Sequence, residues 1–182
     1  MISGRTELLA YAAVFVAAAG AVTDIASGRI FNWLTFPCII AGLVLSAIMG
    51  GSALFFDSLL GALAGLAAYG WMFWLGHMGG GDVKLLMALG ALGGTRFALE
   101  TGLLAVFIGG AIALVALVFT GRIVSFARRL WWFVQTLVAR ELEAEAPKLD
   151  KSWTMPFGVS IAAAAALVVF ADPLSWLGVR PW

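Results

Sequence analysis

The sequence predicts an all-α integral membrane protein with about six transmembrane helices and one amphipathic helix on the membrane surface. The 182 residues are 63% hydrophobic and only 12% charged, and their mean hydropathy is +1.02. Soluble domains are about half apolar and a quarter charged. Long apolar runs divide the chain, with a single long polar segment before the last of them. We therefore expect one membrane-embedded domain over residues 1–182.

The first three apolar runs have the lengths of bilayer-crossing helices. Each has about 15–22 residues, close to the ~20 that cross a bilayer. They cover residues 8–22, 33–49 and 54–75. Gly50-Gly51-Ser52 predicts a tight turn between the second and the third.

The first run also resembles a cleavable signal peptide, because Arg5 precedes it and small residues follow at 17–21. Glu7 does not suit the positively charged start of such a peptide. Cleavage would also leave Asp24 without its helix, so we expect the run to remain as a transmembrane helix.

The fourth run, residues 83–94, is about 12 residues long, which is ~18 Å of helix and too short to span a bilayer alone. Either Asp82 and the glycines before it lie below the membrane surface, or the segment is re-entrant. Thr95-Arg96 predicts the next turn. The remaining runs cover residues 97–120 and 155–171.

The polar segment, about residues 121–153, begins with an amphipathic pattern. Apolar side chains recur there at helical spacing, while arginines and other polar residues occupy the opposite face, which is typical of a helix lying on a membrane surface. The apolar positions are Ile123, Phe126, Leu130, Val134 and Leu137. Residues 141–148, rich in glutamate, indicate a solvated loop.

The distribution of basic residues predicts the orientation. If all six runs span, both termini lie on one side, and Asp24, Asp82 and the polar loop share the other. Eight of the eleven Lys and Arg residues then fall on the aspartate side. By the positive-inside rule that side is cytoplasmic and both termini are outside. The re-entrant alternative would place most of the basic residues outside, which disfavours it.

The two carboxylates at one membrane boundary are the candidate catalytic residues. Asp24 ends the first run, and Asp82 follows Gly79, Gly80 and Gly81. A carboxylate at membrane depth is unfavourable unless it is protonated, paired or hydrated. Two such groups close together share a proton, so that one can take a proton from water while the other donates to a peptide carbonyl. The glycines predict an open backbone edge for an extended peptide.

Three motifs in this order resemble the type IV prepilin peptidases, a family of membrane aspartic proteases. Residues 79–86 (GGGDVKLL) resemble the family's GxGD motif, and residues 24–32 resemble its aspartate followed by an I-P-N-like turn, with Phe31 where proline is common. Residues 155–158 (MPFG) resemble a third element. The short chain is similar to the peptidase-only branch serving tight-adherence (Flp) pili, because it lacks the cysteine-containing methyltransferase-like insert of longer members.

This resemblance implies an aspartic endopeptidase in the bacterial inner membrane that uses Asp24 and Asp82. Its implied substrate is a prepilin, or a pseudopilin, whose leader is cut at the cytoplasmic boundary after entry from the lipid bilayer. The implied residues supporting the site or binding substrate are Asn32, Gly79, Gly80, Gly81, Lys84, Pro156 and Gly158. We expect Lys84 either to bind a pilin carboxylate or to favour ionised Asp82.

Other functions remain open from sequence. A preflagellin or signal-peptide-peptidase-like GxGD protease is one alternative, although the latter expects a tyrosine where Thr23 stands and a P-A-L element. A small transporter or proton channel could use the carboxylates as a relay, although relay carboxylates lie near the bilayer midplane. A catalytically inactive assembly subunit is a third class, disfavoured by the presence of both aspartates.

Several partners and cofactors are not expected. The net charge of +1 gives no reason to expect nucleic acid. The single Cys38 excludes an intrachain disulfide and a CxxC zinc site. His77 near the motif could join the aspartates in a metal site, but a lone interfacial histidine is more often a hydrogen-bonded loop residue. We expect no metal and no cofactor.

Overall fold

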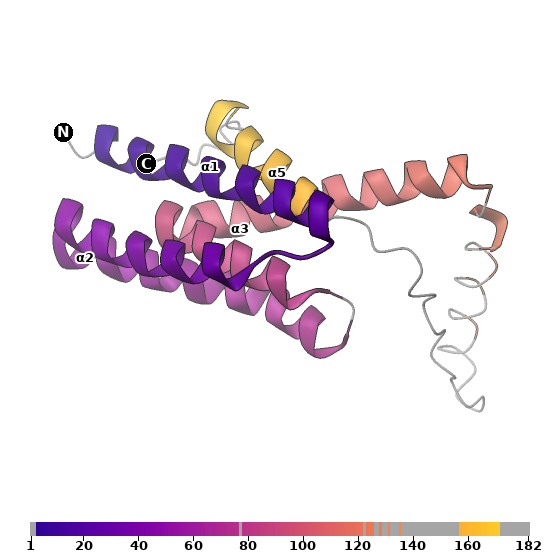
Figure 1. Cartoon of the computed structure of the whole chain (residues 1–182), viewed down its shortest axis with the longest axis horizontal. Coiled ribbons are helices and arrows are strands. Elements are labelled where there is room, and N and C mark those ends of the chain that lie inside the picture. Colours follow the sequence, from indigo (N-terminus) through magenta and orange to yellow (C-terminus); the bar gives the residue numbers. More distant parts are fainter. Residues whose placement is uncertain are drawn as a thin grey trace. The chain divides into compact units, whose positions relative to one another are not determined.

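The computed structural model describes residues 3–76, 78–121, 123–125, 128, 131, 135 and 157–171. Within these residues the structure consists of helices and short connections, which confirms the all-α prediction there. The helices are α1 (Ser3–Ser27), α2 (Asn32–Trp74), α3 (Gly80–Phe119) and α5 (Phe157–Ala171) (Figure 1). Most of the predicted surface helix lies outside the described residues.

The chain divides into two compact units. One comprises Met1–Ile108 together with Pro156–Trp182, and the other is Gly109–Met155. The candidate site residues all belong to the first unit, so each contact described below lies within that unit.

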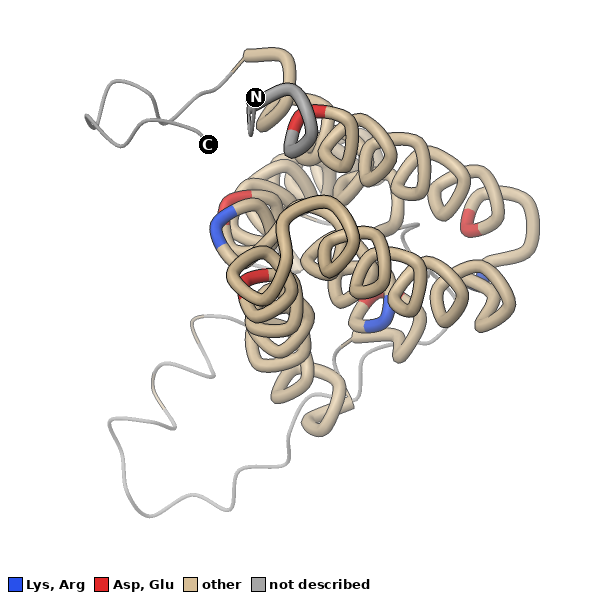
Figure 2. Tube along the Cα trace, turned by 90° about the vertical axis from the view of Figure 1, so that its left-hand side faces the viewer, with Lys and Arg blue, Asp and Glu red and all other residues tan. Residues whose placement is uncertain are grey.

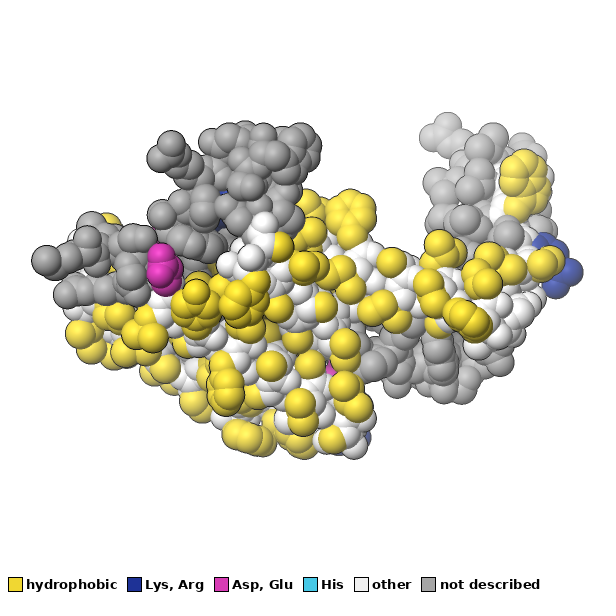
Figure 3. Space-filling model, turned by 90° about the horizontal axis from the view of Figure 1, so that it is seen from above, with side chains coloured by type: hydrophobic (Ala, Val, Ile, Leu, Met, Phe, Trp, Pro, Cys, Tyr) yellow, Lys and Arg dark blue, Asp and Glu magenta, His cyan; other side chains and the backbone are white. Residues whose placement is uncertain are grey.

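Three described helices are long and apolar enough to cross a membrane, namely residues Glu7–Ser27 of α1, α2 and α3, while α5 is a shorter apolar helix. Charged residues are sparse along these helices (Figure 2). Hydrophobic side chains cover much of the described surface in Figure 3, and large ones such as Phe15 and Trp74 point outward. An apolar exterior of this kind suits lipid rather than water.

Helix α2 doubles back on itself at Gly51 (Figure 1). Its 43 residues include one non-helical position, where Gly51 has φ 66° and ψ −153°. A side chain would be strained at this positive φ, so glycine suits the bend. The Ser58 hydroxyl donates a buried hydrogen bond of 2.6 Å to the Ser46 hydroxyl, which joins the two arms. The predicted turn at 50–52 is therefore confirmed, with helix on both sides of a single residue.

Helix α3 bends at Gly94, which has φ 82° and ψ −179°. The turn predicted at Thr95-Arg96 is wrong by one residue, because both residues belong to the helix that follows. Thr95 N–H donates to Asp57 Oδ1 at 3.3 Å, so Asp57 of α2 caps this new helical segment from outside it. Arg96 then forms an ion pair with Glu100 one turn further on.

We expect Asp57→Ala to destabilise the protein without changing the site, because it leaves the Thr95 N–H after the Gly94 bend without its carboxylate cap. Loss of a cap costs about 1 kcal/mol. The measurement is the temperature of half-inactivation in detergent, compared with Asp57→Asn, which keeps a capping oxygen. Equal losses in both variants would contradict a capping role.

Glycines allow α2 and α3 to pack backbone against backbone. A methyl group on Gly61 would lie 2.3 Å from the carbonyl oxygen of Gly90, and one on Gly65 would lie 2.8 Å from that of Leu86. Gly61 and Gly65 are four residues apart and lie on one face of α2. Such small-residue spacing is a common means of close helix association in membranes.

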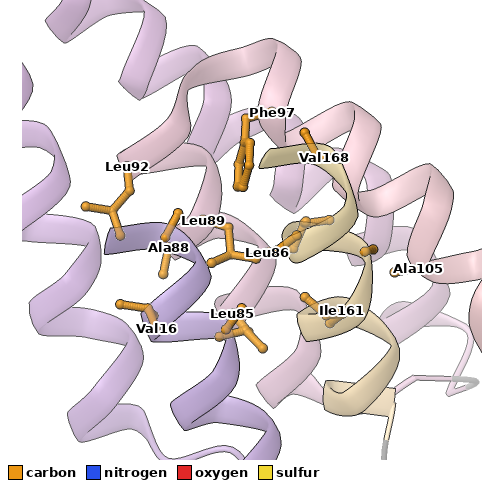
Figure 4. Packing of buried hydrophobic residues seen from close by; sticks show 14 of the residues in the cluster. Val16, Leu85, Leu86, Ala88, Leu89, Leu92, Phe97, Ala105, Ile161 and Val168 are labelled. Atoms are coloured by element: carbon orange, nitrogen blue, oxygen red, sulfur yellow. The ribbon is translucent and has the colours of Figure 1, made fainter. Parts of the chain in front are cut away.

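The buried core lies around the first arm of α3. Leu85, Leu86 and Leu89 are completely buried. Figure 4 shows these leucines between Val16 of α1 and Ile161 of α5. Because Leu85 and Leu86 follow Asp82 by one turn, the core fixes the end of α3 that carries this aspartate.

Candidate active site

Asp24 lies half-buried in the last turn of α1, where its side chain reaches the start of α5. Gly158 N–H donates to Asp24 Oδ2 at 2.9 Å, across 134 residues of sequence. The first N–H groups of a helix have no partner within that helix, and they favour negative charge. Asp24 therefore supplies an acceptor to the N-terminus of α5, and that bond fixes its carboxylate.

Gly158 leaves the space that the Asp24 side chain occupies. A methyl group at position 158 would lie 2.9 Å from Asp24 Oδ2 and 3.1 Å from Asp24 Cβ. Both distances are shorter than an ordinary van der Waals contact, so the carboxylate would have to move. The structure thus brings together two residues that the sequence placed in separate motifs.

Asp82 lies half-buried in the first turn of α3. Its N–H donates to the Gly79 carbonyl at 3.2 Å. A methyl group on Gly79 would lie 3.1 Å from Asp82 Oδ2, so this glycine also leaves room for the carboxylate. Position in the first turn agrees with a helix-capping role for Asp82, and such a role is compatible with catalysis.

Asp24 and Asp82 are brought toward one region by the packing of Gly81 against Ile30 in the turn that follows Asp24. They are separated by 58 positions in sequence and reach the same region from α1 and α3. Each is adjacent to a helix N-terminus, Asp24 that of α5 and Asp82 that of α3. The pairing of the two carboxylates, expected from their equal depth in the sequence, stays a prediction.

Gly80 and Gly81 serve close packing. A methyl group on Gly81 would lie 2.9 Å from Ile30 Cβ, and one on Gly80 would lie 3.1 Å from the Phe73 ring. Both glycines are half-buried in α3, and only Gly79 is exposed. The prediction of an open backbone edge across all three glycines is therefore wrong for Gly80 and Gly81. Instead, Gly81 allows α3 to pack closely against Ile30 in the turn that follows Asp24.

Phe31 adopts a backbone conformation that suits the proline common in this motif. Its φ of −78° and ψ of 139° are extended, and its carbonyl accepts hydrogen bonds from Leu34 and Thr35 at the start of α2. Proline holds φ near −65 ± 15°. Phe31 therefore has a φ that proline would also adopt at the start of α2. Phenylalanine in place of proline leaves the backbone conformation of this turn unchanged.

Lys84 connects α3 to the first turn of α2. Its ammonium donates to Asn32 Oδ1 at 2.9 Å and lies 5.3 Å from the centre of the Phe36 ring. Asn32 and Phe36 are one turn apart, so both face Lys84. Two predicted site residues, Asn32 and Lys84, are thereby brought together, although nothing in either motif identifies them as partners.

Tyr69 belongs to this region and was not among the predicted residues. It is buried on α2, and its hydroxyl donates to the Gly102 carbonyl of α3 at 2.8 Å. Its ring packs edge-on against Phe157, with centroids 5.8 Å apart. The signal in the sequence was its spacing, because Gly61, Gly65 and Tyr69 follow one another at intervals of four.

Two sequence features near the motifs, Pro156 and His77, lie outside the described residues. Within the part of the chain that the structure describes, no three His, Cys, Asp or Glu side chains come together as a metal site.

This arrangement has the components of acid–base chemistry on an uncharged substrate. Two interacting carboxylates in a poorly hydrated site favour one shared proton. The ionised carboxylate can then accept a proton from water, while the protonated one donates to a carbonyl oxygen. Gly79 and Gly158 keep side chains away from the two groups.

Comparison with known families gives one match. The model of the type IV leader peptidase family matches residues 10–114, more than half of the chain. This span contains Asp24, Asn32, Tyr69, Asp82 and Lys84, whereas Gly158 lies beyond it. Comparison with curated proteins and with solved structures gave no significant match.

Proposed function

Because the chain belongs to the type IV leader peptidase family, we propose that it is a membrane aspartic endopeptidase that removes the leader of type IV or Flp-type prepilins. The observation that carries the proposal is the placement of the two carboxylates at the ends of apolar helices, with Asp24 bound to the first turn of α5 and Asp82 in the first turn of α3. A pair of carboxylates sharing a proton is sufficient to hydrolyse a peptide bond without a covalent intermediate.

In the proposed reaction, the ionised aspartate removes a proton from a water molecule, and the resulting hydroxide attacks the scissile carbonyl carbon. The protonated aspartate gives its proton to the carbonyl oxygen. Collapse of the tetrahedral intermediate breaks the C–N bond. The aspartate that took up the water proton gives it to the leaving nitrogen, and the other aspartate takes back the proton from the former carbonyl oxygen, so that the pair again holds one proton. The Gly158 N–H bond holds Asp24 in place during these steps.

The proposed topology has six crossings. Helix α2 has 43 residues, or ~65 Å of helix, about twice the ~30 Å hydrocarbon core, so its bend at Gly51 separates two passes. The bend at Gly94 divides α3 in the same way, and α1 and α5 supply the remaining two. With this topology, the excess of basic residues supports the proposal that Asp24 and Asp82 lie at the cytoplasmic face of the inner membrane and that both termini lie outside.

The test is co-expression of the full chain with an Flp-type prepilin, followed by mass measurement of the pilin. We expect loss of the leader, with the new N-terminus at the boundary between leader and hydrophobic helix. Failure to process any of several Flp-type and type IV prepilins would refute the proposal. Depth labelling at positions 24 and 82 would then test the transport alternative.

Lys84→Met and Asn32→Ala should each slow leader removal, because each breaks the bond that joins the start of α2 to α3. A hydrogen bond of this kind contributes about 1 kcal/mol, which corresponds to a loss of roughly fivefold. The double variant should be no slower than the slower single variant, because both single variants and the double variant lose the same Lys84–Asn32 hydrogen bond. The measurement is the initial rate of leader removal at equal enzyme amounts.

The matched control is Arg29→Met, which removes an exposed cation from the preceding turn. We expect this variant to process prepilin at close to the wild-type rate. Independent, multiplicative losses in Lys84→Met and Asn32→Ala would contradict a common interaction. A pilin carboxylate as the partner of Lys84 would be indicated if only the lysine variant were slowed.

A further inference from the structure

Tyr69 contacts α3, the helix that carries Asp82, and α5, the helix whose first turn binds Asp24. It comes from α2, hydrogen-bonds to Gly102 of α3, and packs its ring on Phe157 at the start of α5. Its side chain is 2% exposed. No step of the proposed reaction uses this residue directly, and its burial leaves it no role at the surface.

The path from Tyr69 to Asp24 is short. Phe157 and Gly158 are adjacent in the first turn of α5, and Gly158 supplies the N–H that holds Asp24. The ring contact of Tyr69 restrains Phe157, and with it the direction of the neighbouring N–H. A shift of the first turn of α5 would therefore move the donor away from Asp24 Oδ2.

The path to Asp82 runs through the core. Leu86 follows Asp82 by one helical turn and packs beside Gly102, where a methyl group would lie 3.1 Å from Leu86 Cδ2 and 3.9 Å from Tyr69 Cε1. The hydroxyl bond of Tyr69 to Gly102 fixes the ring beside this leucine. The same side chain thus contacts Phe157, next to the donor for Asp24, and Gly102, beside which Leu86 of the Asp82 helix packs.

We propose that Tyr69 is a positioning residue for the aspartate pair, holding the start of α5 against Asp24 through Phe157 while its hydroxyl anchors the ring to α3. It acts through Phe157 and Leu86, without touching the reacting atoms. The expected effect of Tyr69 on catalysis rests on the proposed function. Its expected effect on the distance between residues 24 and 158 can be measured without any activity.

The geometric test uses cross-linking between positions 24 and 158. The Cβ position of residue 158 lies 3.1 Å from Asp24 Cβ, near the ~3.5–4.5 Å that a disulfide spans. In a Cys38→Ser background, Asp24→Cys with Gly158→Cys should form a disulfide readily under mild oxidation. We expect Tyr69→Leu to slow this reaction severalfold, and Tyr69→Phe to slow it less because the ring remains.

The matched control is a ring pair between α1 and α5, Tyr11 with Phe170, whose centroids are 6.0 Å apart. Tyr11→Leu removes a tyrosine ring from a contact with α5 that lies away from the aspartates, so the rate of cross-linking should not change. An unchanged rate in Tyr69→Leu, or equal slowing by Tyr11→Leu, would overturn the proposal.

The catalytic test measures kcat and KM for purified prepilin. Misplacement of reacting groups by about 1 Å reduces rates up to about 100-fold. We expect Tyr69→Leu to lower kcat about 10- to 100-fold with KM unchanged, and the double variant with Phe157→Leu to be no slower than the slower single variant. Multiplicative losses would overturn the proposal. If Tyr69→Leu fails to fold, Phe157→Leu carries the same expectation for kcat and for cross-linking.

Failure of the proposed function and failure of the inference about Tyr69 would give different results. If the wild type processes no prepilin, the proposed function is wrong, and the cross-linking rates still decide whether Tyr69 positions Asp24. If the wild type processes prepilin while Tyr69→Leu keeps both kcat and the cross-linking rate, the inference about Tyr69 is wrong and the function stands.

Discussion

Asp24→Asn and Asp82→Asn should each abolish leader removal while the protein remains folded. Asparagine preserves the shape of the side chain and accepts a hydrogen bond, but it cannot bind and release the proton that the reaction moves. General acid–base groups contribute about 10²–10⁴-fold each. We therefore expect each single variant to lose at least about 100-fold in the rate of leader removal, measured by pilin mass after matched expression.

The double variant provides a sharper result. If the two aspartates act as one unit, removing the second after the first has little further effect, as with other catalytic groups that work together. We expect the residual rate of Asp24→Asn combined with Asp82→Asn to equal that of the worse single variant. Multiplicative losses would indicate two carboxylates with independent roles and would contradict a shared-proton pair.

Asp57→Asn is the matched control for charge removal. Asp57 is an exposed aspartate of α2 that caps the bend of α3, and asparagine keeps a capping oxygen. The same chemical change should therefore leave leader removal intact. Thermal unfolding of all four variants in detergent, followed without any activity readout, shows whether a loss of activity reflects unfolding. Retained cleavage in either Asp24→Asn or Asp82→Asn would show that the altered aspartate is structural.

The sequence singled out its candidate catalytic residues because their chemistry conflicts with their surroundings. Asp24 and Asp82 are carboxylates next to long apolar runs, and the free-energy penalty of that placement marks them without any structure. Gly158 entered through the resemblance of its motif. Its role in making room for Asp24 required the packing of α5 against α1, because a glycine before an apolar helix can also serve only to start that helix.

The residues that escaped prediction act through contacts between distant segments. Tyr69 is one aromatic side chain in an apolar run, and only the approach of α3 and α5 shows that its hydroxyl and ring are both engaged. The pairing of Lys84 with Asn32 is similar, since neither motif contains its partner. The bend of α3 falls at Gly94 rather than at Thr95-Arg96 because a cap arrives from Asp57 on α2.

Gly158→Ala should reduce leader removal about 10- to 100-fold, because the added methyl group displaces the Asp24 carboxylate. That methyl carbon would lie 2.9 Å from Asp24 Oδ2, the atom that accepts the Gly158 N–H bond. Alanine is otherwise favoured over glycine in a helix by about 0.8–1.0 kcal/mol. The loss of activity should therefore occur without loss of α5.

Gly110→Ala is the matched control, because a methyl group on this helical glycine of α3 meets nothing within 4 Å. It should leave both activity and thermal inactivation close to wild type. Leader removal at the wild-type rate by Gly158→Ala would mean that Asp24 leaves the start of α5 during catalysis. A large loss confined to Gly158→Ala, with normal thermal stability, would instead show that the working position of Asp24 is the one that its bond to α5 defines.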